Sequence, residues 1–145
     1  MNLSKNIKIT KVKAGQATAT TEVSSDAVDM TGYDGCLFFA SIATANAGNY
    51  LKVEQSKVSN FATHEDLKGS KVAPDKDAMV AIVDVYCPLE GQGKYLRAAV
   101  VRTATTATGD IYAIQYHGRS LPEVNAVAEK MAVKLLISPE QEAIT

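Results

Sequence analysis

The residues best suited to chemistry in this sequence are the adjacent trio His64, Glu65 and Asp66, which place an imidazole beside two carboxylates. Such side chains can bind a metal ion or transfer a proton. Consecutive residues on a polar loop rarely converge on one ion, however, and no second His or Cys lies nearby. We therefore expect neither a metal site nor a cofactor here.

The other catalytic signatures in the sequence are incomplete. His117 precedes Gly118 at the end of a predicted strand, where a structural or surface histidine is the usual occupant. Gly91 and Gly93 are not followed by the Lys-Ser/Thr pair of a phosphate-binding loop, and no Gly-x-Ser-x-Gly elbow occurs. We predict that the protein is not an enzyme, and a hydrolase that uses His64 and His117 is the alternative.

Two cysteines, Cys36 and Cys87, lie in apolar runs typical of strands. This placement favours two buried thiols in a reducing compartment. A disulfide between neighbouring strands is the alternative, because spacing along the chain does not give the distance between two thiols.

The length and the net charge of the chain indicate how many domains it has and which partners it is not expected to bind. The 145 residues fit a single domain spanning residues 1–145, and 15 Lys plus Arg nearly balance 16 Asp plus Glu. A balanced charge predicts no nucleic-acid or membrane partner. The apolar runs are too short to span a bilayer, and residues 1–13 lack the apolar centre of a signal peptide, so we expect synthesis in the cytoplasm.

Strand signals dominate the chain. Residues 36–43 form a nearly continuous apolar run, which predicts a central strand buried on both faces. Residues 79–87 alternate, with Met79, Ala81, Val83, Val85 and Cys87 on one face. The full set of predicted strands covers residues 7–10, 17–23, 36–43, 50–56, 79–87, 95–103 and 110–117. This pattern predicts an all-β, antiparallel, jelly-roll-like sandwich with extended N- and C-terminal segments.

The segments between and after the predicted strands also have recognisable sequence patterns. The turn at residues 46–49 predicts a β-hairpin into residues 50–56. The polar stretch 57–77 predicts a long surface loop. Residues 119–145 are expected to form a C-terminal tail, in which a helix through residues 124–135 competes with a strand at 134–137; we favour the extended form.

Two surface features could serve binding. The first is a set of lysines with no acid before Glu22, within a segment that is either an N-terminal arm or an edge strand (residues 1–13); these lysines either dock an acidic neighbour or protect the edge. They are Lys5, Lys8, Lys11 and Lys13. The second is the pair Tyr112 and Tyr116, which share a strand face with Ile114 and form either a stacking platform or a sheet-packing pair.

Five segments together resemble a known family. They are GYDGCLF (32–38), LKVEQS (51–56), KYLRA (94–98), IQYHGR (114–119) and the closing ISPE (137–140). In this order they resemble the small virion proteins of tailed bacteriophages known as capsid decoration or cement proteins. The resemblance covers most of the chain, and its motifs are structural rather than catalytic.

The resemblance implies a virion protein on the outer capsid surface, where it bridges subunits of the major capsid protein lattice and stabilises it. It also implies a homo-oligomer, either a dimer or a trimer, and no reaction. From their expected exposure, we assign lattice contacts to Lys5, Lys8, Lys11 and Lys13, to the 57–77 loop and to the C-terminal tail. Removal of residues 1–13 is expected to weaken these contacts and leave the fold intact.

Two other classes of function are alternatives. A tail-tube or head-fibre component would share the fold but assemble into rings or project from one vertex. A carbohydrate-binding module would use Tyr50, Tyr112 or Tyr116 as an exposed platform, although the absence of Trp weakens this hypothesis.

Overall fold

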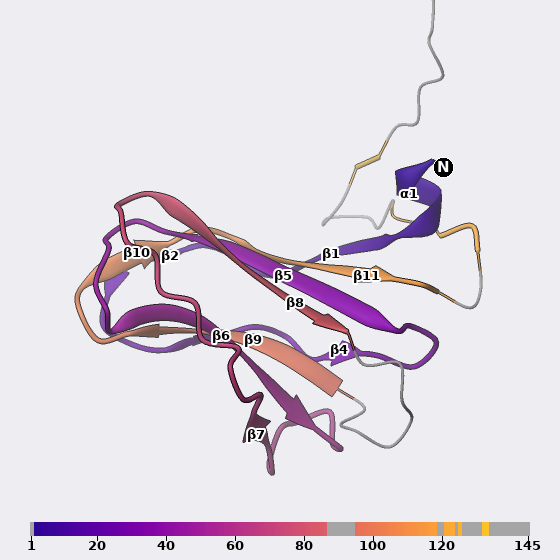
Figure 1. The fold of residues 1–145 in the computed structure, drawn as a ribbon, viewed down its shortest axis with the longest axis horizontal. Helices are drawn as coiled ribbons and strands as arrows, with labels where there is room; N and C mark the ends of the chain where they lie inside the picture. The colour runs from indigo at the N-terminus through magenta and orange to yellow at the C-terminus, as the bar shows by residue number, and fades with distance from the viewer. Residues whose placement is uncertain (1, 87–94, 119–120, 124, 126–131, 134–145) are drawn as a thin grey trace, which may run out of the picture.

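The protein is a sandwich of two antiparallel β-sheets (Figure 1). The computed structural model describes residues 2–86, 95–118, 121–123, 125 and 132–133. Within them the first sheet holds β1 (Lys8–Lys13), β2 (Gln16–Ala19), β5 (Gly35–Ile42), β8 (Met79–Tyr86), β10 (Thr106–Thr108) and β11 (Ile111–Tyr116). The second holds β3 (Val23–Ser24), β4 (Val28–Asp29), β6 (Asn49–Ser56), β7 (Glu65–Asp66) and β9 (Tyr95–Arg102). A short helix, α1 (Leu3–Asn6), precedes β1.

The order of the strands gives a jelly roll. The first sheet runs β1-β11-β5-β8 and the second runs β4-β9-β6-β7, so the chain passes repeatedly from one sheet to the other. Two Greek keys interleaved in this way define the jelly-roll architecture. The predicted all-β, antiparallel, jelly-roll-like sandwich is therefore confirmed.

The predicted hairpin at residues 46–49 is wrong. A compact turn is present, in which the amides of Gly48 and Asn49 bond to Asn46. The strands on either side of it belong to different sheets, because β6 pairs with β9 while β5 pairs with β8 and β11. The buried Asn49 side chain holds this crossover by accepting from the Ala104 amide and donating to the Thr44 carbonyl. The turn carries the chain across the sandwich rather than back along β5.

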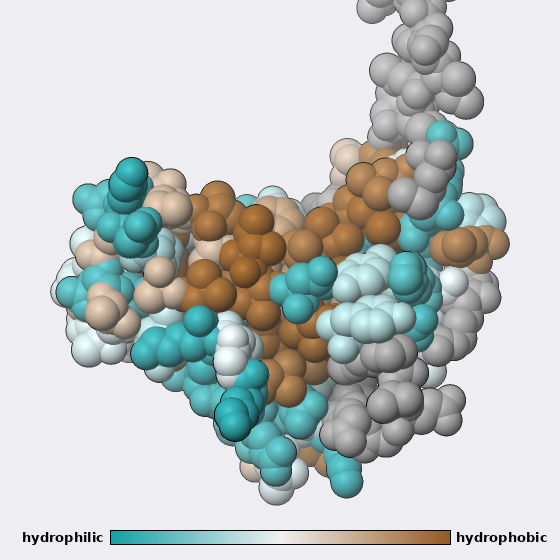
Figure 2. All heavy atoms as spheres, in the orientation of Figure 1, coloured by the Kyte–Doolittle hydropathy of each residue, from teal (hydrophilic) through white to brown (hydrophobic). Residues whose placement is uncertain are grey.

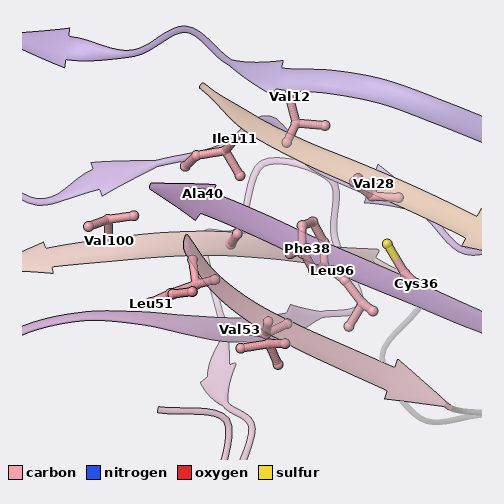
Figure 3. Packing of buried hydrophobic residues seen from close by; sticks show 14 of the residues in the cluster. Val12, Val28, Cys36, Phe38, Ala40, Leu51, Val53, Leu96, Val100 and Ile111 are labelled. Carbon is pink, nitrogen blue, oxygen red and sulfur yellow. The ribbon is translucent and has the colours of Figure 1, made fainter. Parts of the chain in front are cut away.

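The core lies between the two sheets and is filled mainly from alternate positions of the longer strands (Figure 3). Strand β5 contributes Phe38 and Ile42, and β6 and β9 contribute Leu51 and Leu96, all with no exposed surface. Burying such side chains contributes about 1.5 to 3 kcal/mol each. Sheet-on-sheet packing is therefore the main source of stability.

Strand β5 is central, as predicted, but only one of its faces is fully buried. Cys36, Phe38 and Ala40 point into the core, whereas Leu37 and Phe39 are partly exposed on the opposite face. The prediction of burial on both faces is wrong, because no described residue forms a third layer over the first sheet. Cys36 is buried, and Cys87 lies outside the described residues, so the pairing of the two thiols stays a prediction.

The N-terminal segment is not the extended arm that was one of the two predictions for residues 1–13. Residues 8–13 form edge strand β1 against β11, and the preceding α1 is a helix where extended chain was expected. The buried Asn125 fastens this edge, because its side-chain oxygen accepts from the Ile9 amide and its amide group donates to the carbonyls of Ser4 and Ile7. Most of the tail predicted for residues 119–145, including the helix or strand at 124–137, lies outside the described residues.

The 57–77 segment is a surface excursion, as predicted, but it is partly ordered by the second sheet. It contains β7, and Val72 forms a bridge with Leu51 of β6. Phe61 and Ser70 are buried, and the Ser70 hydroxyl accepts from the Val53 amide. The loop therefore covers the edge of the second sheet.

Phe38 and Phe39 provide a matched test of this architecture. Truncation of the core residue, Phe38→Ala, should lower the free energy of unfolding by about 3 to 5 kcal/mol, because it leaves a cavity between the sheets. Phe39→Ala removes an outward ring and should cost less than about 2 kcal/mol. Chemical denaturation of both variants measures the difference. Equal losses would contradict the assignment of the two faces.

Candidate interaction surface

One face of the first sheet is turned away from the core and is largely apolar; we term it the outer face. Its side chains follow from the strand registers, which place Phe39 beside Ile82 on one side and Tyr112 on the other. The members are Ile9, Lys11, Leu37, Phe39, Ser41, Val80, Ile82, Asp84, Tyr86, Tyr112, Ile114 and Tyr116. Figure 2 shows a continuous brown area over β8 and β5. Large exposed apolar patches on soluble domains mark interaction sites.

Strand β8 carries the most exposed part of the outer face. Val80, Ile82 and Tyr86 are 52%, 54% and 57% exposed. The predicted strand is confirmed, and its inward face holds the buried Ala81 and Val83. Sequence reasoning missed the outward face because alternation normally places polar residues there. The signal was available, since residues 79–83 contain no polar side chain at all.

Aromatic rings flatten one end of the outer face. The Tyr116 ring lies directly over Gly35, so a Cβ at this position would push the ring away from the sheet. Its hydroxyl donates to Asp84 on β8 at 2.6 Å. Burial, reinforced by this hydrogen bond, raises the pKa of the Tyr116 phenol. The ring of Tyr86 runs parallel to it at 6.4 Å, and the exposed His117 meets both edge-on.

The middle of the outer face holds a second aromatic pair. Tyr112 stacks on Phe39 with ring centroids 5.3 Å apart. The predicted sharing of one face by Tyr112, Tyr116 and Ile114 agrees with the alternation of β11. Tyr50 lies elsewhere, on β6 of the second sheet, with the Lys71 ammonium 4.1 Å above its ring.

The four predicted contact lysines do not form one patch. Lys5 is on α1, and Lys8 lies opposite the inward-facing Gln115, whereas Lys11 lies opposite Tyr112 on the outer face. Lys13 follows a register shift and lies opposite Ile111. These positions spread the charges around the β1 edge of the sheet, which is the arrangement expected of lysines that protect an edge strand.

Strand β1 is also an integral part of the core. Its Val12 is buried and joins the main hydrophobic cluster, and Lys11 forms an ion pair with Asp110 at 3.3 Å. The Gly15 amide and then the Lys11 ammonium lower the pKa of the Asp110 carboxyl. Removal of residues 1–13 would strip β11 of its neighbour and Val12 from the core, so from the structure we expect this deletion to destabilise the fold rather than leave it intact.

The trio His64, Glu65 and Asp66 does not act as a unit. Within the described part of the chain, no three His, Cys, Asp or Glu side chains form a metal-binding group. The His64 ring lies 3.7 Å from the buried Glu54, while Asp66 bonds to Lys52 at 3.1 Å. Gly91 and Gly93 lie outside the described residues.

Glu54 is the centre of a charge network on the second sheet. The residue is 1% exposed, and its carboxylate accepts from both Nε and Nη2 of Arg97 at 2.7 Å. The Lys52 ammonium lies 3.3 Å away. Burial opposes the charge of Lys52, but its hydrogen bonds to Asp66 and Glu54 outweigh burial and raise its pKa. The Arg97 guanidinium also covers the Phe61 ring at 4.5 Å. This network fastens the 57–77 loop to the sheet.

Comparison with known proteins identifies no family: no family model and no curated protein matches the chain. Among the described residues, no helix has the length and apolar character needed to cross a membrane.

The Tyr116 to Asp84 bond predicts a pH dependence. The folded protein holds the phenolic proton more tightly than the unfolded chain, so the bond stabilises the fold below about pH 10 and this contribution is lost as the pH rises toward the raised folded pKa. Tyr116→Phe should lower the free energy of unfolding by about 1 kcal/mol at neutral pH. The deficit should shrink above about pH 10 in urea titrations. A deficit that is constant with pH would contradict this account, and Asp84→Asn should weaken the pH dependence.

The Glu54 network predicts a large effect of one buried carboxylate. Glu54→Ala leaves the Arg97 guanidinium without its partner and should cost about 3 to 5 kcal/mol in the free energy of unfolding. Asp66→Ala removes an exposed partner of Lys52 and should cost less than about 1 kcal/mol. Both values come from chemical denaturation. Similar costs for the two variants would show that the buried pair does not anchor the loop.

Proposed function

We propose that this chain is a structural virion protein that binds the outer surface of an icosahedral phage head and stabilises the major capsid protein lattice. The observation that carries the proposal is the outer face, an exposed apolar and aromatic sheet surface. The resemblance noted in the sequence supplies the partner. The protein acts by binding, and the residues proposed for contact belong to the outer face and the β1 edge.

The chemistry of the outer face suits a protein partner. Protein interfaces are depleted in charge at their centre, enriched in Tyr and Phe, and polar at the rim. Here Leu37, Phe39 and Tyr112 occupy the middle of the face, while Lys11 lies toward one edge. The apolar centre would supply affinity, and the predicted contact lysines Lys5, Lys8, Lys11 and Lys13 would steer the approach to an acidic neighbour.

A rigid sheet is also mechanically suited to bridging subunits. Binding to the assembled shell but not to its dissociated subunits shifts the equilibrium toward the shell, by an amount that grows with the concentration of the bound protein. A flat face held by a packed core loses little conformational freedom when it binds. Decoration therefore stabilises the lattice without any covalent chemistry.

Copy number separates this proposal from the alternatives within the virion. Mature, undecorated capsids of the parent phage are incubated with the purified protein and sedimented, and the bound copies per capsid subunit are counted. Saturation at a fixed lattice ratio is expected. A few copies per particle would favour a tail-tube or head-fibre component, and no binding would overturn the proposal.

A double variant identifies the docking face. Leu37→Glu with Ile9→Glu places two carboxylates on the outer face without touching the core, and should lower capsid affinity at least about tenfold. Replacing Lys5, Lys8, Lys11 and Lys13 by Gln removes each charge but keeps a polar side chain, and should reduce the salt dependence of binding. Unchanged capsid binding by the double variant would remove the outer face from the interface.

The aromatic end of the outer face favours a second candidate, a carbohydrate-binding module. Tyr86 is exposed beside the parallel Tyr116 ring, and Asp84 lies next to them as a hydrogen-bond acceptor. Sugar faces stack on such rings. Binding of soluble glycans that is lost in Tyr86→Ala, by a protein that does not sediment with capsids, would favour this candidate.

A further inference from the structure

The two long edges of the first sheet are treated very differently. At the β1 edge, Asn125 accepts from the Ile9 amide, the Glu123 amide donates to the Lys5 carbonyl, and lysines line the strand. At the opposite edge, β5 is the only strand that pairs with the backbone of β8 within the described residues. Strand β8 is eight residues long, contains no Lys, Arg or Pro, and carries four large apolar side chains that are exposed, namely Met79, Val80, Ile82 and Tyr86. Long apolar edges of this kind are templates for pairing with another strand.

We propose that β8 pairs with β8 of a second copy of this chain, antiparallel and about a twofold axis, to join the two first sheets into one. A second copy is the occupant that the charges favour. Asp84 is the single charged side chain of β8. A register centred on Ile82 places Asp84 opposite Val80 of the other copy, and a register centred on Val83 places Asp84 opposite Ile82. In neither register do the two Asp84 carboxylates face each other. A twofold axis also makes the contact self-limiting, because each β8 edge is used once.

The geometry of this pairing gives the dimer a consequence for binding. Antiparallel strands related by a twofold axis perpendicular to the sheet keep their corresponding faces on the same side. The two outer faces would therefore form one continuous apolar surface of double width. This role of the dimer rests on the proposed function, in which doubled contact with a lattice raises avidity without any new type of contact. The pairing itself rests on β8 alone.

Sedimentation equilibrium of the full chain, without capsids, tests the pairing. Wild type is expected to be a dimer. Val80→Glu with Ile82→Glu puts acid opposite acid in both registers and should raise the dissociation constant at least about tenfold. The double variant Leu37→Glu with Ile9→Glu adds the same charge to the same face away from the edge, and should remain a dimer. A monomeric wild type, or equal loss of the dimer in both variants, would overturn the inference.

Hydrogen exchange of the wild type gives a test that does not depend on whether a variant folds. Amides of β8 should gain protection as the protein concentration rises through the dimer range, while amides of β1 should not change. Protection of β8 that is independent of concentration would also overturn the inference. A dimer that fails to bind capsids would leave the pairing standing and reject the proposed function, and a monomer that decorates capsids would do the reverse.

Discussion

The packing of β5 against the second sheet determines which residues of the first sheet meet solvent. Phe38 and Ile42 of β5 are enclosed by the core that Leu51 and Leu96 help to form. Because side chains of a strand alternate with a period of two, a slip of one residue would exchange the buried and exposed sets. Large inward side chains therefore lock the register of β5. Through its pairing with β8 and β11, that register places every member of the outer face.

Buried polar groups close the ends of this sandwich. Arg102 is 4% exposed and donates to the carbonyls of Ala17, Thr21 and Thr106 and to the Thr21 hydroxyl. It thereby binds the short strands β2 and β10 and the chain after β2 to the end of β9. Guanidinium groups suit this task because their five donors lie in a fixed plane. Glu54 has a comparable role at the other side of the second sheet, with the difference that it accepts from Arg97 and Lys52.

Patterns that are local in sequence predicted the strands. The way in which those strands join into sheets, and the anchoring of the β1 edge, depend on contacts between residues far apart in the sequence. The alternation of residues 79–86 and 111–116 identified β8 and β11 because period-two burial is a local signal. The turn at 46–49 was read as a hairpin, since nothing local distinguishes a turn between paired strands from one that crosses between sheets. The anchoring of Ile9 by Asn125 joins residues 116 positions apart. The outer face was missed because alternation normally places polar residues at the outward positions that Val80 and Ile82 occupy.

The difference between the two edges of the first sheet is informative because both belong to the same sheet. If exposed edges were tolerated simply because this protein is stable, the β1 edge would not need its lysines or the contacts with Asn125. The β1 edge has the protections that keep strands from pairing, whereas β8 has no lysine or proline and only one charged side chain, Asp84. An apolar, unprotected edge beside an apolar face promotes indiscriminate association unless a defined partner covers it. The asymmetry therefore supports the proposal that a protein partner covers the β8 side of the molecule, and it agrees with a β1 edge that stays in contact with water.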